Sequence, residues 1–170
     1  MAFTLIETMV AVILLALLVG AATLTFTGPI RRAQFSQSLE QLRYLDASTR
    51  DFARRSGRDA TIVFDLADNT LGRRVGRSNG LVFRAQIPAP LHIDDVWTPA
   101  GRRDYGEVAI PVSPLGLSET YAVKLTGPDG LQQWILVAGF GGEIRTLNDD
   151  REIESILSSA TPARGGRHAD

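Results

Sequence analysis

The stretch that decides the fold of this chain is Phe3-Thr4-Leu5-Ile6-Glu7-Thr8-Met9-Val10-Ala11-Val12. The apolar run that begins there continues to Phe26, and Glu7 is its only charged residue. A helix needs roughly 20 apolar residues to cross the hydrocarbon core of a bilayer, so the run predicts a transmembrane helix over residues 3–29. A carboxylate inside a membrane helix costs about 2.5–3.5 kcal/mol on insertion scales, and such a residue usually has a function and a partner. Glu7 is therefore the first candidate functional residue.

Phe3-Thr4-Leu5-Ile6-Glu7, with the apolar run directly behind it, resembles the start of a mature type IV pilin or type II secretion pseudopilin. In that family a prepilin peptidase cuts just before the Phe, the new amine is N-methylated, and the Glu guides subunit assembly. The resemblance implies cleavage between Ala2 and Phe3, N-methylation of Phe3 and an assembly role for Glu7. It also implies a single-pass protein of the bacterial inner membrane with a periplasmic C-terminal domain. The implied partners are other pseudopilins or pilins through the N-terminal helix, the prepilin peptidase, the inner-membrane assembly platform and the lipid bilayer.

A secretory signal peptide and a plain membrane anchor are the alternative interpretations of the apolar run. A signal peptide has a basic n-region and a 7–15-residue apolar core followed by a small-residue cleavage site. This chain has no basic residue before the run, the run is too long, and Thr25-Phe26-Thr27-Gly28-Pro29 is a poor cleavage site. A plain anchor would have no reason to keep Glu7. The pilin-like interpretation explains the span and the charge together.

Two features depart from the family pattern. Ala2 stands where the family has Gly, and residues 1–2 form only a residual leader without Lys or Arg. The positive-inside rule places basic flanks in the cytoplasm, and here Arg31 and Arg32 follow the span. Charge alone therefore predicts a cytoplasmic C-terminal domain, whereas the resemblance predicts a periplasmic one. We expect that a basic leader precedes the start of this sequence and that the domain is periplasmic.

The composition beyond the span predicts one neutral globular domain. The chain has 170 residues, and about 140 of them follow the span, which suits a single domain with its own core. Glu7 is the only charge before Arg31, so 18 of the 19 acidic residues balance the 18 basic ones in this part. A neutral domain does not favour nucleic acid as a partner. The absence of cysteine excludes disulfides, thiolate metal sites and a Cys nucleophile.

Residues 30–57 predict an amphipathic continuation of the N-terminal helix. Apolar and small residues recur there every three or four positions, while charged residues occupy the other sides, and Gly57 suits a C-terminal cap. We expect one long helix over residues 3–56, whose second half packs against the domain. The predicted buried stripe is Phe35, Leu39, Leu42, Leu45, Thr49 and Phe52, and the charged sides carry Arg31, Arg32, Glu40, Arg43, Arg50, Arg54 and Arg55.

Residues 58–157 predict an antiparallel β-sheet domain, which makes the fold class α+β. Alternating β-branched and aromatic residues predict strands over 60–66, 81–84, 108–112, 120–125, 133–138 and 143–147. Gly127-Pro128-Asp129-Gly130 predicts the turn of the clearest hairpin, and Pro111 predicts an edge strand. Residues 86–104 predict a long irregular surface loop. Ile153 to Leu157 predict a short last helix, and residues 158–170 predict a disordered tail.

The resemblance extends into this domain and is closest to the H-type minor pseudopilin. It rests on the helix Ala33 to Arg58, on Thr61-Ile62-Val63-Phe64-Asp65, and on the late unit from Tyr121 to Ile144. It implies a minor pseudopilin of a type II secretion pseudopilus that supports protein export. The alternatives are a minor type IV pilin for pilus assembly or DNA uptake, and a membrane-anchored binding module.

No constellation in the sequence predicts catalysis, and we expect no enzyme, no metal site and no cofactor. His92 lies beside Asp94 and Asp95, but no second His or Cys lies at ligand spacing, so a solvated loop is the better interpretation. Asp149 and Asp150 suit a helix start, although Ca²⁺ binding near them stays open. Gly139 to Gly142 lacks the following helix of a phosphate-binding loop, so it predicts a turn. Ser113 and Ser118 lack the Gly-x-Ser-x-Gly context of a catalytic nucleophile. The basic cluster of Arg73, Arg74 and Arg77 predicts a solvated turn.

Overall fold

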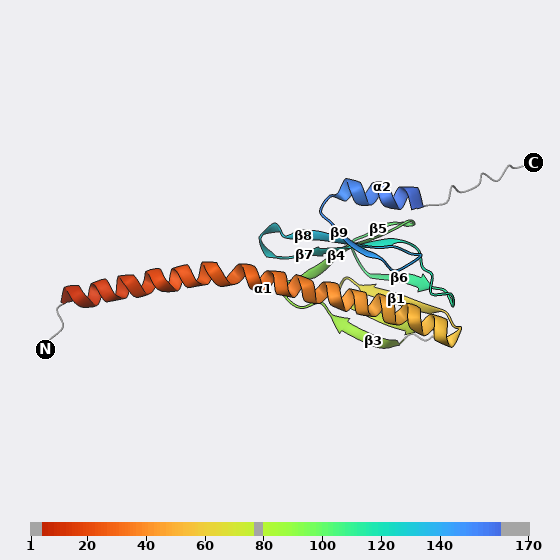
Figure 1. Ribbon diagram of the computed structural model, residues 1–170, viewed down its shortest axis with the longest axis horizontal. Coiled ribbons are helices and arrows are strands. Elements are labelled where there is room, and N and C mark those ends of the chain that lie inside the picture. The colour runs from red at the N-terminus through yellow and green to blue at the C-terminus, as the bar shows by residue number, and fades with distance from the viewer. Residues whose placement is uncertain (1–4, 77–79, 161–170) are drawn as a thin grey trace, which may run out of the picture. The chain divides into compact units, whose positions relative to one another are not determined.

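The computed structural model describes residues 5–76 and 80–160, and the side chains of residues 21–32, 129 and 160 lie outside this description. The chain divides into two units, Met1–Ser36 and Gln37–Asp170. Helix α1 (Leu5–Ser56) contributes to both units (Figure 1). The predicted long helix is therefore confirmed from Leu5 onward.

Helix α1 ends where its sequence predicts. Gly57 adopts a φ of 61°, the left-handed conformation in which glycine closes a helix at little cost. Arg54 and Arg55 lie in the last turn, where positive charge interacts favourably with the helix dipole. Arg55 also pairs with Asp51 one turn earlier, at 2.9 Å between Nε and Oδ2. The second half of the helix therefore ends with local stabilisation of its own.

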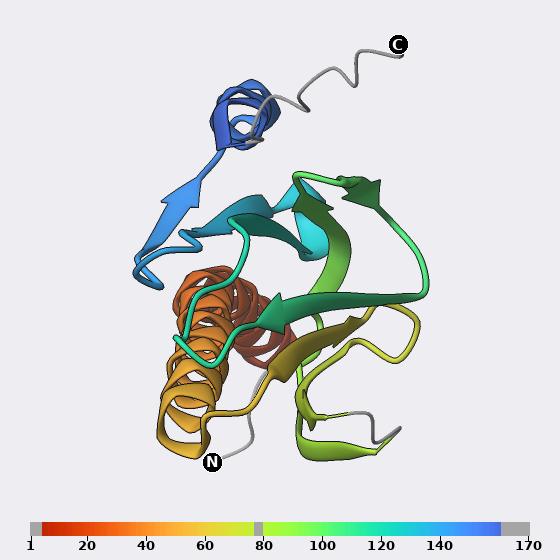
Figure 2. The same cartoon turned by 90° about the vertical axis from the view of Figure 1, so that its right-hand side faces the viewer.

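The domain contains two antiparallel sheets. The four-stranded sheet has the order β3-β2-β1-β6, and the five-stranded sheet has the order β5-β4-β7-β8-β9 (Figure 2). The first sheet consists of β1 (Ala60–Asp65), β2 (Thr70–Val75), β3 (Leu81–Gln86) and β6 (Glu107–Val112). The second consists of β4 (His92–Thr98), β5 (Gly101–Arg103), β7 (Tyr121–Thr126), β8 (Gln132–Val137) and β9 (Ile144–Leu147). A single 3₁₀ turn, η1 (Pro128–Gly130), joins β7 to β8.

The strongest sequence patterns are confirmed. β7 and β8 form the predicted hairpin, with Tyr121 opposite Val137 and Thr126 opposite Gln132. β6, which contains Pro111, lies at an edge of its sheet. An edge strand tolerates proline because one side of its backbone needs no ladder partner.

The prediction of an irregular loop over residues 86–104 is wrong. β4 lies inside the five-stranded sheet between β5 and β7, and β5 is also part of that segment. The loop prediction followed from Pro88, Pro90, Pro99 and Gly101, but these residues lie outside β4 or in β5, and Asp95 within β4 is buried, 3% exposed. Its charge is neutralised by Arg102 of β5, which donates from Nε and Nη2 to the two carboxylate oxygens at 2.9 and 2.5 Å.

The solvated-turn interpretation of Arg73 and Arg74 is also wrong. Both residues lie in β2, a strand that the sequence analysis did not predict. Arg74 is paired across the sheet with Glu107 of β6 by two hydrogen bonds of 2.9 and 2.8 Å. Cross-strand pairing of this kind makes a charged position compatible with a strand. Arg77 lies outside the described residues.

The core lies between the second half of α1 and the two sheets. Leu42 and Leu45 of α1 are 2% and 0% exposed. Leu42 shares a small apolar space with residues from both sheets, namely Phe64, Leu71, Ile93, Val123, Leu125 and Ile135. Each fully buried Leu or Phe side chain contributes about 1.5–3 kcal/mol of stability. Phe35, Leu39 and Phe52 of the predicted stripe are half-buried.

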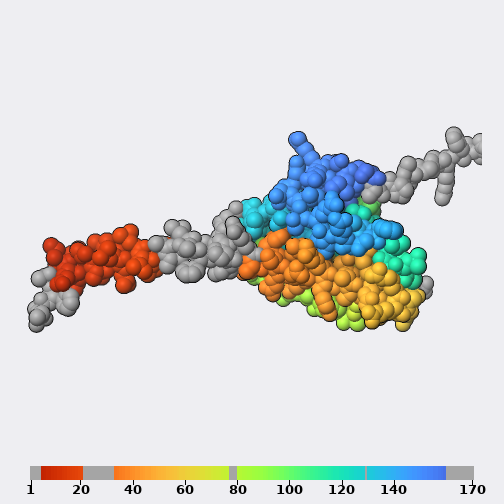
Figure 3. Space-filling model, in the orientation of Figure 1, coloured from red at the N-terminus to blue at the C-terminus, as the bar shows by residue number. Residues whose placement is uncertain are grey.

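Helix α2 (Asp150–Ala160) closes the described chain and packs on the five-stranded sheet. Its atoms belong to the blue surface of the domain in Figure 3. Its apolar face carries Ile153 and Leu157, which are buried against Ala122, Trp134 and Leu136. The predicted short last helix is confirmed, and it continues three residues past Leu157. The rest of the predicted tail, residues 161–170, lies outside the described residues.

Candidate functional site

The first candidate site is the apolar segment of α1 from Leu5 to Gly20. Every described side chain of this segment is exposed. Its large apolar side chains expose between 52% and 81% of their surface, the extremes being Val10 and Leu5. Because a helix turns every 3.6 residues, consecutive apolar residues face all sides of it. A helix of a soluble domain usually buries one apolar face, whereas this segment exposes apolar side chains on all sides.

The polar groups of this segment are few, and one of them is satisfied within the helix. The Thr8 hydroxyl donates to the Leu5 carbonyl oxygen at 2.8 Å. This local bond removes the cost of an unpaired hydroxyl in apolar surroundings. Glu7 is different, because no ion pair in the described part of the chain includes it. It lies in the first turn of α1, where a negative charge is favoured by the helix dipole.

The predicted processing residues cannot be placed beside Glu7. Ala2 and Phe3 lie outside the described residues, so cleavage and N-methylation stay predictions. The predicted span, residues 3–29, lies partly outside them as well, since residues 3 and 4 and the side chains of 21–29 are not described. Among the described residues, no helix combines the length and the apolar character needed to cross a membrane.

A second feature, which the sequence analysis missed, is a buried ion pair in the other half of α1. Asp46 and Arg50 are 2% and 3% exposed, and Arg50 Nε donates to Asp46 Oδ2 at 2.7 Å. The prediction that Arg50 lies on a charged outer side of the helix is therefore wrong. Asp46 and Arg50 belong to the face that also buries Leu42 and Ala53. Their separation of four residues on that face was the available signal.

Arg50 of α1 binds two loops, one that contains Gly116 and Ser118 and one that contains Ala138 and Gly139. Its Nη1 donates to the carbonyl oxygens of Gly116 and Gly139 at 3.0 and 2.7 Å. Its Nη2 donates to Ser118 Oγ at 2.8 Å and to the Ala138 carbonyl oxygen at 3.4 Å. Together with the bond to Asp46, these occupy all five N–H groups of the guanidinium. A buried charge is tolerated when it is paired and fully hydrogen-bonded, and Arg50 meets both conditions.

Tyr121 completes this buried network from β7. Its hydroxyl donates to Asp46 Oδ1 at 3.1 Å, and the residue is 0% exposed. Burial, and after it the negative charge of Asp46, raise the pKa of the Tyr121 hydroxyl well above its usual value. The hydroxyl therefore stays protonated and acts as a donor. The network positions α1 against the loops that contain Gly116 and Gly139.

The loop that approaches Arg50 requires glycine. A Cβ at Gly139 would lie 2.2 Å from the Ser118 carbonyl oxygen, and a Cβ at Gly142 would lie 2.8 Å from Asp46 Oδ2. Gly142 also has a φ of 68°, a backbone conformation that residues other than glycine rarely adopt. The Gly-rich segment Gly139 to Gly142 is therefore a close-approach turn, as its lack of a following helix predicted.

The other residues singled out in the sequence do not meet in one site. His92 is exposed on β4, Asp94 accepts from Thr126 Oγ1 at 3.2 Å, and Asp95 is paired with Arg102. Within residues 5–76 and 80–160, no group of three or more metal-ligating side chains is present.

Asp149 and Asp150 form the start of α2, and the helix-start interpretation is confirmed. Asp149 Oδ1 accepts from the backbone N–H of Arg151 at 2.9 Å. Asp150 Oδ1 accepts from Trp134 Nε1 at 2.6 Å, and Oδ2 lies 3.7 Å from Lys124 Nζ and from Arg102 Nη1. The Trp134 bond, followed by the charges of Lys124 and Arg102, lowers the pKa of the Asp150 carboxyl below its usual value.

The fold is that of the pilin-like class, a helix packed by its second half on antiparallel sheets. Among solved structures, two of the minor pseudopilin EpsH from the type II secretion system of Vibrio cholerae have this fold. One matches with a TM-score of 0.52 and 12% identity, over 69% of this chain and 97% of that one. The other matches with a TM-score of 0.51 and 12% identity, over 68% and 96%. At this identity the likeness shows the fold alone.

No protein-family model and no curated protein matches the sequence. The likeness to pseudopilins therefore rests on the comparison of folds. The H-type assignment and the processing motif rest on the sequence resemblance.

Proposed function

We propose that this chain is a minor pseudopilin, a structural subunit of a type II secretion pseudopilus that supports protein export. The observation that carries the proposal is one helix with two contrasting halves on a pseudopilin-like fold. Its residues Leu5 to Gly20 are apolar on all sides apart from Glu7 and Thr8, while its residues from Gln37 onward form the core of a β-domain. Such a helix suits a subunit that inserts its first half among other helices and carries a folded domain on its second half.

The proposal places residues 3–29 in the bacterial inner membrane and the domain in the periplasm. A prepilin peptidase would remove the residues before Phe3, and the new α-amine would be methylated. The apolar run from Phe3 to Phe26 and its resemblance to processed pilins support this part. Other pseudopilins and the assembly platform would then be the partners of the apolar segment.

Glu7 would set the register between neighbouring subunits. Cleavage before Phe3 creates a cation at the edge of the bilayer, and Glu7 lies four residues further on, about 6 Å along a helix axis. Each charge is costly alone in poorly solvated surroundings and much less costly when the two are paired. A neighbour shifted by about one helical turn would bring its amine level with Glu7. Only that stagger neutralises both charges.

The test compares Glu7→Leu, Glu7→Asp and Thr8→Val in cells that depend on this subunit. Glu7→Leu lowers the cost of membrane insertion but removes the partner of the amine, so the subunit inserts and assembly is lost. Glu7→Asp keeps the charge on a shorter side chain and assembles in part. Thr8→Val changes the adjacent polar residue and serves as the matched control.

Secretion, piliation and cross-linking to partner subunits are measured together for each variant. Loss of secretion with Glu7→Leu supports the proposal, and loss of piliation instead identifies a type IV pilus subunit. Normal assembly by Glu7→Leu contradicts the proposed register role. Reporter fusions after Gly57 test the orientation separately, and activity of a cytoplasmic reporter alone would contradict a periplasmic domain.

A further inference from the structure

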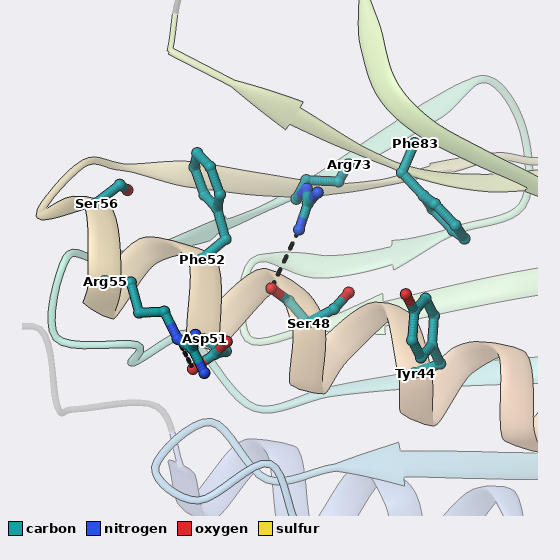
Figure 4. Close-up of a pocket in the computed structure, with 8 residues that line it drawn as sticks. All are labelled: Tyr44, Ser48, Asp51, Phe52, Arg55, Ser56, Arg73 and Phe83. Atoms are coloured by element: carbon teal, nitrogen blue, oxygen red, sulfur yellow. Dashed lines mark hydrogen bonds and ion pairs between the residues drawn. The ribbon is translucent and has the colours of Figure 1, made fainter.

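A groove on the domain runs between the second half of α1 and strands β2 and β3. It has a volume of about 460 Å³. Three aromatic residues line it, Tyr44 and Phe52 from α1 and Phe83 from β3 (Figure 4). Tyr44 is 63% exposed, and its ring lies 5.9 Å from that of Phe83. The remaining lining residues are Ser48, Asp51, Arg55, Ser56 and Arg73.

Arg73 reaches from β2 toward the helix, with Phe52 on one side and Phe83 on the other (Figure 4). Its guanidinium lies over the Phe52 ring, 4.9 Å from the centroid, and its Nη1 donates to the Ser48 carbonyl oxygen at 3.1 Å. These contacts fix the orientation of a half-buried cation inside the groove. They do not neutralise its charge.

Arg73 differs in this respect from its neighbours on the sheets. Arg74, Arg84 and Arg102 are each paired with a carboxylate, whereas no ion pair in the described part of the chain includes Arg73. Its Nε, like that of Arg74, is buried and has no hydrogen-bond partner among the described residues. Among the described lining residues, Asp51 is the one carboxylate, and it is already paired with Arg55. The groove therefore carries one uncompensated positive charge between aromatic rings.

We propose that this groove binds an extended segment of a partner protein in which a carboxylate is flanked by apolar or aromatic side chains. The carboxylate would lie against Arg73, where a charge-assisted hydrogen bond is strong because solvent is partly excluded. The flanking apolar side chains would pack on Tyr44, Phe52 and Phe83, whose rings supply contact area at low entropic cost. This inference does not depend on membrane insertion or on secretion, so its failure would leave the proposed function standing.

The test uses the full chain in detergent micelles and a blocked pentapeptide of sequence Gly-Phe-Glu-Phe-Gly as the probe. Titration calorimetry gives the affinity, and the Nε–H resonance of Arg73 in nuclear magnetic resonance spectra reports the place of binding. A peptide with Gln in place of Glu is expected to bind about ten- to hundredfold more weakly, since a hydrogen bond to a charged group contributes about 1.5–3 kcal/mol. Binding of the Glu peptide is also expected to weaken with added salt.

Four variants, one of them a control, locate the site. Arg73→Gln is expected to lose the preference for Glu over Gln, and Arg73→Lys to restore part of it. Arg74→Gln is the matched control, because Arg74 is adjacent in sequence but pairs with Glu107 on the other face of the sheet. Tyr44→Ala removes an exposed ring that the core does not need, so it should weaken binding without unfolding the domain.

Three results would overturn the inference. These are no binding of the Glu peptide at millimolar concentration, equal binding of the two peptides, and equal loss with Arg73→Gln and Arg74→Gln.

Discussion

The two halves of α1 differ in how much of their apolar surface they expose. From Leu5 to Gly20 the helix is apolar and exposed on every side, and Glu7 is its one charged residue. From Gln37 to Ser56 it is amphipathic, and its buried face combines Leu42 and Leu45 with the charged pair of Asp46 and Arg50. The first half exposes its apolar side chains on every side, whereas the second half buries Leu42 and Leu45 within the domain. One helix thus joins an exposed apolar segment to a segment that packs into a folded domain.

The largest effect is expected from Arg50→Ala in the second half of α1. Removal of one member of a buried pair leaves Asp46 uncompensated and frees three carbonyl groups, which should lower the free energy of unfolding by about 3–5 kcal/mol. Denaturant unfolding of the full chain in micelles measures this change in the free energy of unfolding. Arg43→Ala is the control, because Arg43 and Glu40 form an exposed pair that contributes about 0–1 kcal/mol. Equal losses for both variants would refute the buried network.

Leu42→Ala should lower the free energy of unfolding by about 2–5 kcal/mol, because it leaves a cavity against both sheets. Leu15→Ala removes the same atoms from a side chain that is 70% exposed in the first half. It should leave domain unfolding unchanged. If Leu15→Ala destabilised the domain as much as Leu42→Ala, the contrast between the two halves would be wrong.

Gly139→Ala should destabilise the domain by about 1–3 kcal/mol, the usual cost of overpacking. The added Cβ meets the Ser118 carbonyl oxygen at 2.2 Å and displaces a loop that Arg50 holds. Gly141→Ala, two residues further on, meets nothing within 4 Å and is the control. Thermal unfolding of both variants decides between a constrained turn and a permissive one. Similar melting temperatures would show that the loop is free to move.

The smallest effect concerns the attachment of α2 and its dependence on pH. The pKa of the Asp150 carboxyl is lowered in the folded protein, so the stability from its charge is present above the ordinary Asp pKa of about 3.9 and is lost as the pH falls through the lowered value. The stability difference between the native protein and Asp150→Asn should therefore shrink toward acid pH. Asp149→Asn, which keeps the contacts of Trp134, is the control. A difference that does not vary with pH would contradict this account.

The sequence predicted the parts of the fold that a local pattern can encode. The β7–β8 hairpin follows from two alternating strands around Gly127 to Gly130, and the edge position of β6 follows from Pro111. The exposed first half of α1 follows from an apolar run without a polar side. In each case the deciding residues are adjacent in the chain.

The parts that were missed depend on partners distant in the chain. β4 was interpreted as loop because Pro88, Pro90, Pro99 and Gly101 surround it, whereas the strand is stabilised by its pairing with β5 and β7. Arg50 was placed on an outer side because, apart from Asp46, its acceptors Gly116 and Gly139 lie 66 and 89 residues away along the chain. Arg73 was assigned to a turn, and neither its strand nor its groove could be inferred without β3 and α1 in place. The strand pairing and the backbone acceptors that bury these residues are distant in the chain, so a local pattern does not reveal them.

The most direct measurement of the contrast between the two halves is cysteine cross-linking in cells that contain the assembled system. The chain has no cysteine, so Leu14→Cys and Ser38→Cys each introduce a unique thiol, one in the exposed first half and one at a position that is 0% exposed. We predict that Leu14→Cys cross-links to a neighbouring subunit, that Glu7→Leu abolishes this product, and that Ser38→Cys stays unreactive. A Leu14→Cys subunit that remains monomeric in secreting cells would contradict the account, as would a Ser38→Cys thiol that reacts equally fast.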